Sequence, residues 1–171
     1  GGLTAVGSLV KSSISDWVAY NKEIREMTQV TGIGAEEISR IVQVADDWGI
    51  SVGEVRTALA YMNRSGLKPS VENLAKLADE YVNTADKTAF AEKAVKLLGR
   101  GYQTLIPLFA QGGDALKEWA ASVDDSLIAT EDSIKAGREY EEIMDTFGDT
   151  LTGLKNNIAM EVLPTFNKLL K

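Results

Sequence analysis

SVGEVRTALAYMNRSGLKPSVENLAKLADEYVN, residues 51–83, contains the start and stop signals of two consecutive helices. Ser51 and Glu54 have the spacing of a capping box, in which the Ser51 hydroxyl accepts from the backbone N–H of Glu54 and the Glu54 carboxylate accepts from that of Ser51. Gly66 is expected to end this helix, and Ser70, which follows a proline, can cap the next. Short capped helices of this kind predict an all-α fold.

Apolar residues recur every three or four positions in these two helices and in the segments on either side. The stripes are Ile38, Ile41, Val42, Ala45 and Trp48; Val55, Ala58, Leu59 and Met62; Val71, Leu74, Leu77, Ala78 and Tyr81; and Phe90, Ala94, Leu97 and Leu98. Pro107 should kink a helix or begin a new one, and Gly112, Gly113 and Asp114 should form a break and a cap. No alternating strand pattern competes, so residues 31–126 are predicted to form a compact bundle of short helices.

Longer stripes occupy both ends of the chain. Residues 1–30 have a heptad pattern with Leu3, Val10, Trp17 and Ile24 in one set and Val6, Ser13, Tyr20 and Met27 in the other. In residues 127–171, Tyr140, Met144, Phe147, Leu151, Leu154 and Ile158 alternate in steps of three and four, and the pattern then slips by one step to Val162, Phe166 and Leu169. We predict long N- and C-terminal helices that pack as an antiparallel pair, with Thr130 capping the last helix and a break near Pro164.

Composition excludes several functional classes. With 44% apolar and 25% charged residues in the 171-residue chain, we expect an ordered protein. The seven-charge acidic excess argues against specific nucleic-acid binding, which needs clustered Lys and Arg. The chain has no Cys and no His, so disulfides, Cys/His zinc sites and Ser-His-Asp catalysis are impossible within it.

The first ten residues, GGLTAVGSLV, are about half the ~20 that a helix needs to cross a bilayer. We interpret them as a small-residue helix packed on another helix, and a membrane-active segment in a larger parent protein is the alternative. The chain begins without Met and ends on Lys within a helical pattern, so we expect it to be a piece of a longer protein.

Carboxylates gather at three places, and none has the pattern of a catalytic or metal site. The last helix carries Glu139, Glu141, Glu142, Asp145 and Asp149. A di-metal site would normally add Glu-x-x-His pairs, so we interpret this cluster as a solvated acidic face. The pairs Asp46-Asp47 and Asp124-Asp125 sit at helix ends, where capping and solvation are a simpler explanation than glycosidase chemistry.

Glycines and tryptophans also have structural explanations. Gly32-x-Gly34 and Gly99-x-Gly101 do not complete a phosphate-binding pattern and are interpreted as helix breaks. Trp17, Trp48 and Trp119 fall on apolar stripes, which predicts that they pack in the core, and any one left exposed would mark a contact site. The sequence assigns no catalytic, cofactor-binding or metal-ligating residue.

Three phrases carry a family resemblance: SGLKPSVENLAKLADEY at 65–81, DKTAFAEKAVKLLGRGYQTLIPLFAQGGDALKEWA at 86–120, and GDTLTGLKNNIAMEVLPTFNKLL at 148–170. With the helix after Gly34 and the ADD-x-G turn at 45–49, they follow the order of elements in the tail tape measure proteins of long-tailed bacteriophages, which the chain resembles from Thr31 to Leu170. Gly34 stands at a cap where relatives often carry Ser or Thr, and Leu-Pro replaces the more usual Ile-Pro.

The resemblance implies a non-catalytic structural protein that determines tail length and occupies the interior of the virion tail tube after synthesis in the bacterial cytoplasm. It also implies self-association and contacts with tail tube and tail assembly chaperone proteins. No cofactor is implied, and membrane contact would come only through other parts of the parent protein. A helical adaptor or regulator that binds one protein partner is the alternative, because it would show the same composition and caps.

Overall fold

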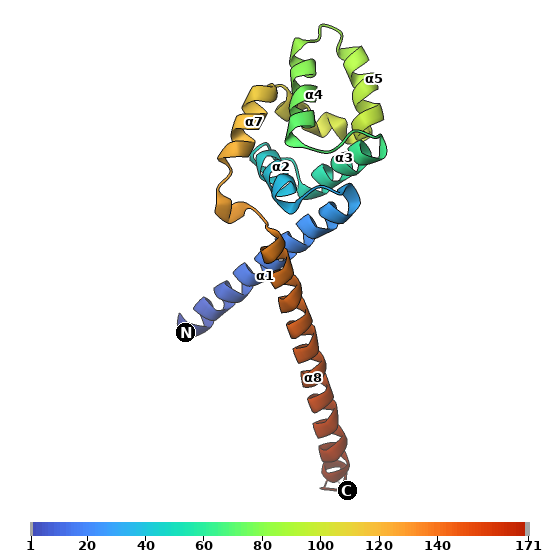
Figure 1. Ribbon diagram of the computed structural model, residues 1–171. Helices are drawn as coiled ribbons and strands as arrows, with labels where there is room; N and C mark the ends of the chain where they lie inside the picture. The colour runs from blue at the N-terminus through green and yellow to red at the C-terminus, as the bar shows by residue number, and fades with distance from the viewer. Residues whose placement is uncertain (1, 170–171) are drawn as a thin grey trace. The chain divides into compact units, whose positions relative to one another are not determined.

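The computed structural model describes the backbone of residues 2–169 and the side chains of residues 13–157. Every regular element in this part of the chain is helical, as the sequence predicts (Figure 1). The α-helices are α1 (Gly2–Thr31), α2 (Ala35–Asp47), α3 (Val52–Arg64), α4 (Val71–Asn83), α5 (Lys87–Leu98), α6 (Ile106–Phe109), α7 (Gly113–Ser122) and α8 (Glu131–Leu169). Two 3₁₀ helices, η1 (Arg100–Leu105) and η2 (Asp125–Leu127), complete the order.

The chain divides into two units. Ala19–Ile134 forms one unit, called here the compact unit, and the second consists of Gly1–Val18 with Lys135–Lys171. The predicted bundle, residues 31–126, falls inside the compact unit, which also takes in the end of α1 and the first turn of α8.

The core of the compact unit is built from the predicted stripes. Within it, α4 packs against α5, α6 and α7, while α2 packs against α3 and α7 (Figure 1). The largest fully buried hydrophobic side chains are Phe109, Ile24, Met27, Ile38, Leu59, Met62 and Leu98. Burial of each such side chain contributes about 1.5–3 kcal/mol, so these helices are stable mainly through shared packing.

Local hydrogen bonds fix the helix starts where the sequence predicts them. The Ser51–Glu54 capping box is complete, with the Ser51 backbone N–H donating to Glu54 Oε2 at 2.8 Å and the Glu54 N–H donating to Ser51 Oγ at 3.3 Å. Ser70 Oγ accepts from the backbone of Asn73 at 3.1 Å. Thr130 Oγ1 accepts from the backbone of Ser133, also at 3.1 Å, at the start of α8.

Proline and glycine punctuation is confirmed, with one difference in the cap of α7. Pro107 lies in the first turn of α6, where its missing N–H is harmless. Gly112, at φ 83°, separates α6 from α7 as predicted. The cap, however, comes from α4: Asp79 Oδ1 accepts from the Gly113 backbone N–H at 2.7 Å, and Asp114 makes no capping hydrogen bond.

Gly113 is also required by close packing. A Cβ atom at this position would lie 2.4 Å from the Ala75 carbonyl oxygen and 2.6 Å from Asp79 Oδ2. A salt bridge between Lys117 and Glu72, 3.4 Å long, joins the same two helices. The contact between α4 and α7 therefore excludes any side chain at the first residue of α7.

Buried polar contacts hold the start of α8 within the compact unit. Ser39 Oγ, in α2, accepts from the backbone N–H of Ala129 at 2.9 Å. The Ser133 hydroxyl donates to Asn21 Oδ1 at 2.6 Å, and Asn21 itself is buried. These bonds link segments more than 80 residues apart, so they form only when the unit folds.

Parts of the terminal predictions fall outside the described side chains. This applies to Leu3, Val6 and Val10 in α1 and to Ile158, Val162, Phe166 and Leu169 in α8. Antiparallel pairing of α1 and α8 stays a prediction. The bounds of α8 run through Pro164, so the helix does not end there, and a bend at this position stays a prediction. No helix in the described part of the chain is long and apolar enough to span a membrane.

Candidate interaction surface

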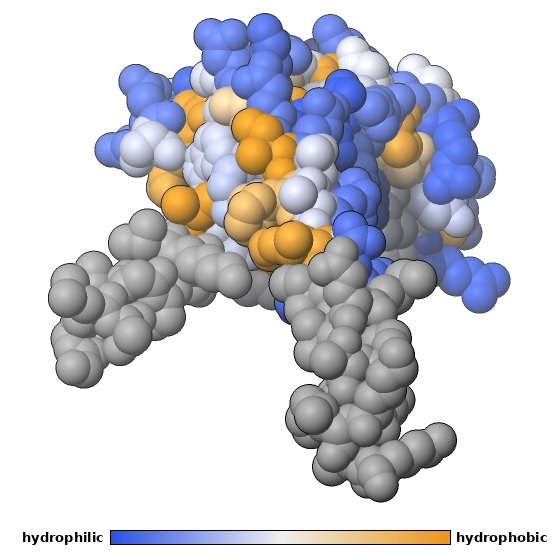
Figure 2. Space-filling model, turned by 90° about the horizontal axis from the view of Figure 1, so that it is seen from below, coloured by the Kyte–Doolittle hydropathy of each residue, from blue (hydrophilic) through white to orange (hydrophobic). Residues whose placement is uncertain are grey.

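The clearest exposed feature of the molecule is a row of large hydrophobic side chains on α8, called here the α8 apolar face. It consists of Ile143, Met144, Phe147, Leu151 and Leu154, which are 66%, 41%, 55%, 40% and 55% exposed. Elsewhere the described surface is largely hydrophilic, with smaller patches of hydrophobic residues (Figure 2). Contiguous apolar surface of this kind on a soluble protein marks a contact site.

Helix geometry brings these five side chains to one side of α8. Each residue turns the helix by about 100°, so steps of three and four keep them within an arc of about 80°. The face extends about 17 Å from Ile143 to Leu154 at 1.5 Å per residue. An arc of this width is typical of a helix that contacts more than one neighbour, because a two-helix seam uses only two positions per heptad.

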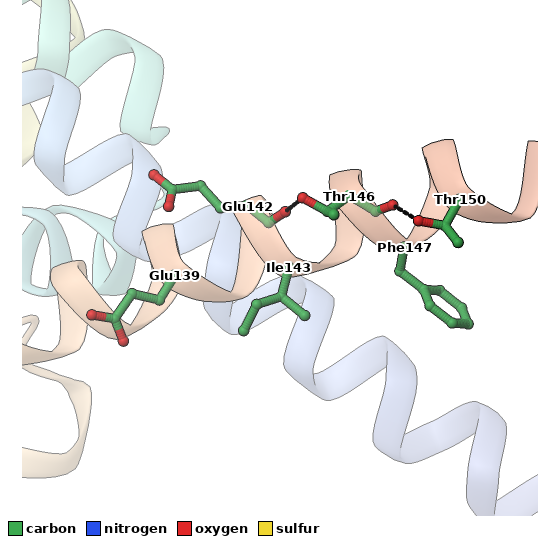
Figure 3. Close-up of a pocket in the computed structure, with 6 residues that line it drawn as sticks. All are labelled: Glu139, Glu142, Ile143, Thr146, Phe147 and Thr150. Atoms are coloured by element: carbon green, nitrogen blue, oxygen red, sulfur yellow. Dashed lines mark hydrogen bonds between the residues drawn. The ribbon is translucent and has the colours of Figure 1, made fainter. Parts of the chain in front are cut away.

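A shallow groove of about 570 Å³ lies along one edge of this face. Its described lining is Glu139, Glu142, Ile143, Thr146, Phe147 and Thr150, and Ile143 and Phe147 project from the same side of the helix (Figure 3). Thr146 Oγ1 donates to the Glu142 carbonyl and Thr150 Oγ1 to the Thr146 carbonyl, each at 2.9 Å. Because both hydroxyl protons are used within the helix, the groove favours an apolar ligand.

The acidic residues of α8 are mainly solvated, as the sequence predicts. Glu139, Glu142, Asp145 and Asp149 are exposed, and Glu141 is half-buried. Lys135–Glu139 and Arg138–Glu142 form ion pairs of 4.0 and 3.7 Å, whose exposure limits their contribution to stability. Among the described residues, no group of His, Cys, Asp or Glu could hold a metal ion.

The two aspartate pairs behave differently. Asp124 caps η2, with Oδ1 accepting from the Ser126 hydroxyl at 2.5 Å and from its backbone N–H at 2.8 Å. These two hydrogen bonds hold the pKa of the Asp124 carboxyl below its ordinary value. Asp46 and Asp47 lie in the last turn of α2, and the prediction that this pair caps a helix is wrong, because a carboxylate cannot donate to the free carbonyls at a helix C-terminus.

The prediction that all three tryptophans pack in the core is also wrong. Trp17 is 41% exposed and Trp48 is 36% exposed, while Trp119 is half-buried against the core. The rings of Trp48 and Trp119 contact each other, with centroids 5.5 Å apart and planes inclined at 36°. A position on an apolar stripe does not ensure burial at a helix end, where fewer neighbouring helices are present to cover a large ring.

Comparisons with protein-family models, with curated proteins and with solved structures found no match for this chain. Function must therefore be argued from the exposed α8 apolar face, from the charge distribution and from the sequence resemblance. In the residues that the structure describes, the best-defined candidate for a functional site is a protein-binding surface.

Proposed function

We propose that this chain is a segment of a bacteriophage tail tape measure protein, a non-catalytic assembly protein that determines tail length and lies within the tail tube. The observation that carries the proposal is the order of the five sequence elements between Thr31 and Leu170, which resembles the order in that family. The exposed α8 apolar face supports an assembly role, because such a face is stable in water only when another helix covers it.

The proposed mechanism uses helix length as a measure. A helix rises 1.5 Å per residue, so the 39 residues of α8 span about 58 Å. Extended helical segments therefore convert chain length directly into tail length. The acidic excess of the chain would discourage retention of DNA that later passes through the same tube.

Self-association through the α8 apolar face is part of the proposal, and tail tube and chaperone proteins are the other proposed partners. Antiparallel pairing with the heptad stripe of α1 is a second way to cover the face within one chain. Sedimentation measurements on the α8 variant Phe147→Asp distinguish the two: loss of an oligomer supports association between chains. A monomeric wild type that buries both stripes contradicts it.

The direct test is an in-frame deletion of the codons for Thr31 to Asp125 in the parent phage gene, followed by electron microscopy of the particles. Intact tails shortened in proportion to the deleted residues support the tape measure role. Tails of normal length, or absent tails, would instead assign the segment to partner binding or to assembly initiation.

A helical adaptor or regulator is the second candidate, and the compact unit favours it because that unit has its own core and its own helix caps. The neighbouring gene sequence separates the two candidates. Hundreds of further helical residues favour the tape measure proposal, whereas a stop codon close by favours the adaptor. We propose no enzymatic role, and peptidoglycan clearing that is lost in Asp124→Asn or Glu142→Gln would contradict this.

A further inference from the structure

The C-terminal end of α2 carries charges that its own helix disfavours. Asp46 and Asp47 occupy its last turn, where the helix dipole is negative, and no basic residue lies in that turn. Both side chains are exposed, and neither forms an ion pair with a described residue. The Gly49 backbone N–H donates to the Asp46 carbonyl at 2.9 Å, so the backbone is capped without any contribution from the two carboxylates.

An exposed aromatic surface adjoins these carboxylates. Trp48 directly follows Asp47, and its ring contacts that of Trp119 from α7 at 5.5 Å between centroids. The face of an indole ring attracts cations through its quadrupole, and a guanidinium is the most common partner. Arg40, the one basic residue of α2, lies two turns earlier, and its Nη1 donates to the Ala120 carbonyl at 2.8 Å.

We propose that Asp46, Asp47 and the Trp48–Trp119 pair form a binding surface for an arginine side chain on a basic segment of a partner protein. A guanidinium can stack on an indole while donating two hydrogen bonds to one carboxylate, a combination that the compact lysine ammonium does not match. Its charge would also offset the negative end of α2. The compact unit, with 18 acidic against 12 basic residues, would attract such a segment from a distance.

This inference is independent of the tape measure proposal, because it rests only on the contacts and charges of the compact unit. The test uses isothermal titration calorimetry of the full chain with a synthetic twelve-residue peptide of alternating Gly and Arg. We expect binding that weakens by about tenfold in the double variant Asp46→Asn/Asp47→Asn and in Trp48→Leu. A Gly-Lys peptide of the same length should bind more weakly than the Gly-Arg peptide.

The control is Asp145→Asn/Asp149→Asn, which removes the same charge from exposed positions on α8. Unchanged affinity in this control supports the proposal, whereas equal weakening in both double variants would show general electrostatic attraction and overturn it. Equal binding of the Gly-Arg and Gly-Lys peptides would also overturn it.

Thermal unfolding provides a second readout. Asp46→Asn/Asp47→Asn should melt at a higher temperature than the wild type, because neutral side chains replace carboxylates at the negative end of α2. A lower melting temperature would show that the carboxylates stabilise the folded chain, and would overturn the argument for an unmet charge.

Discussion

α1 and α8 both carry apolar residues at heptad spacing, but the two stripes have different environments. Ile24 and Met27 of α1 are fully buried in the compact unit. Met144 and Phe147 of α8, with the same spacing, are 41% and 55% exposed. The comparison shows that a stripe identifies the side of a helix that needs a neighbour, while the neighbour itself is supplied by the rest of the fold or by another molecule.

The largest expected effect separates two phenylalanines. Phe109→Ala should lower the free energy of unfolding by about 3–5 kcal/mol, because it empties a fully buried core position. Phe147→Ala should change it by less than about 0.5 kcal/mol at low protein concentration, because its ring is already in solvent. Urea unfolding measures both, and equal losses would show that α8 is packed in a way this structure does not contain.

Two glycines sharpen the same comparison with opposite signs. Gly113→Ala should destabilise the compact unit by about 1–3 kcal/mol, because its Cβ would overlap the Ala75 carbonyl. Gly148→Ala meets nothing within 4 Å and should stabilise α8 by about 0.5–1 kcal/mol through helix propensity. Urea unfolding reports the first change and circular dichroism the second. A helicity loss in Gly148→Ala would contradict an open α8 surface.

Hydroxyl groups in the two regions should differ in a similar way. Ser51→Ala removes the N-cap of α3 and should cost about 1 kcal/mol. Thr146→Ala in α8 removes only a bond to the Glu142 carbonyl four residues earlier and should raise stability by a few tenths of a kcal/mol. Chemical denaturation of both variants checks this, and a destabilised Thr146→Ala would indicate an unseen contact of α8.

The smallest effect is the pH dependence of the α3 cap. The Ser51 backbone N–H, and then its hydroxyl, hold the pKa of Glu54 below its ordinary value. A carboxylate with a lowered folded pKa adds stability above its unfolded pKa, and this stability is lost as pH falls through the folded pKa. Urea midpoints of the wild type and Glu54→Gln should therefore differ at neutral pH and converge in acid. A difference that stays constant with pH would contradict this origin.

Helix ends proved predictable because their signals are local. Ser51, Ser70 and Thr130 each accept a hydrogen bond from a residue three positions later, so the amino-acid order is enough to place the bond. The Asp79 cap of α7 was not predictable in this way, since its two partners are 34 residues apart. Only packing of α4 against α7 brings them together.

The candidate surface was partly predictable. The spacing of Met144, Phe147, Leu151 and Leu154 places them on one side of a helix from sequence alone. Their exposure, and that of Trp48, depends on which elements lie nearby, and periodicity contains no information about neighbours. The pairing of Trp48 with Trp119 joins α2 to α7 and likewise had no local signal.

The sequence by itself determined the all-α class, most helix boundaries and the absence of Cys and His chemistry, because caps, glycines and composition act within a few residues. The tertiary structure alone decided which apolar faces are covered, that Gly113 admits no side chain, and that two carboxylates stand unpaired at the end of α2. These outcomes depend on contacts between distant segments, whose free energy is set by packing in three dimensions.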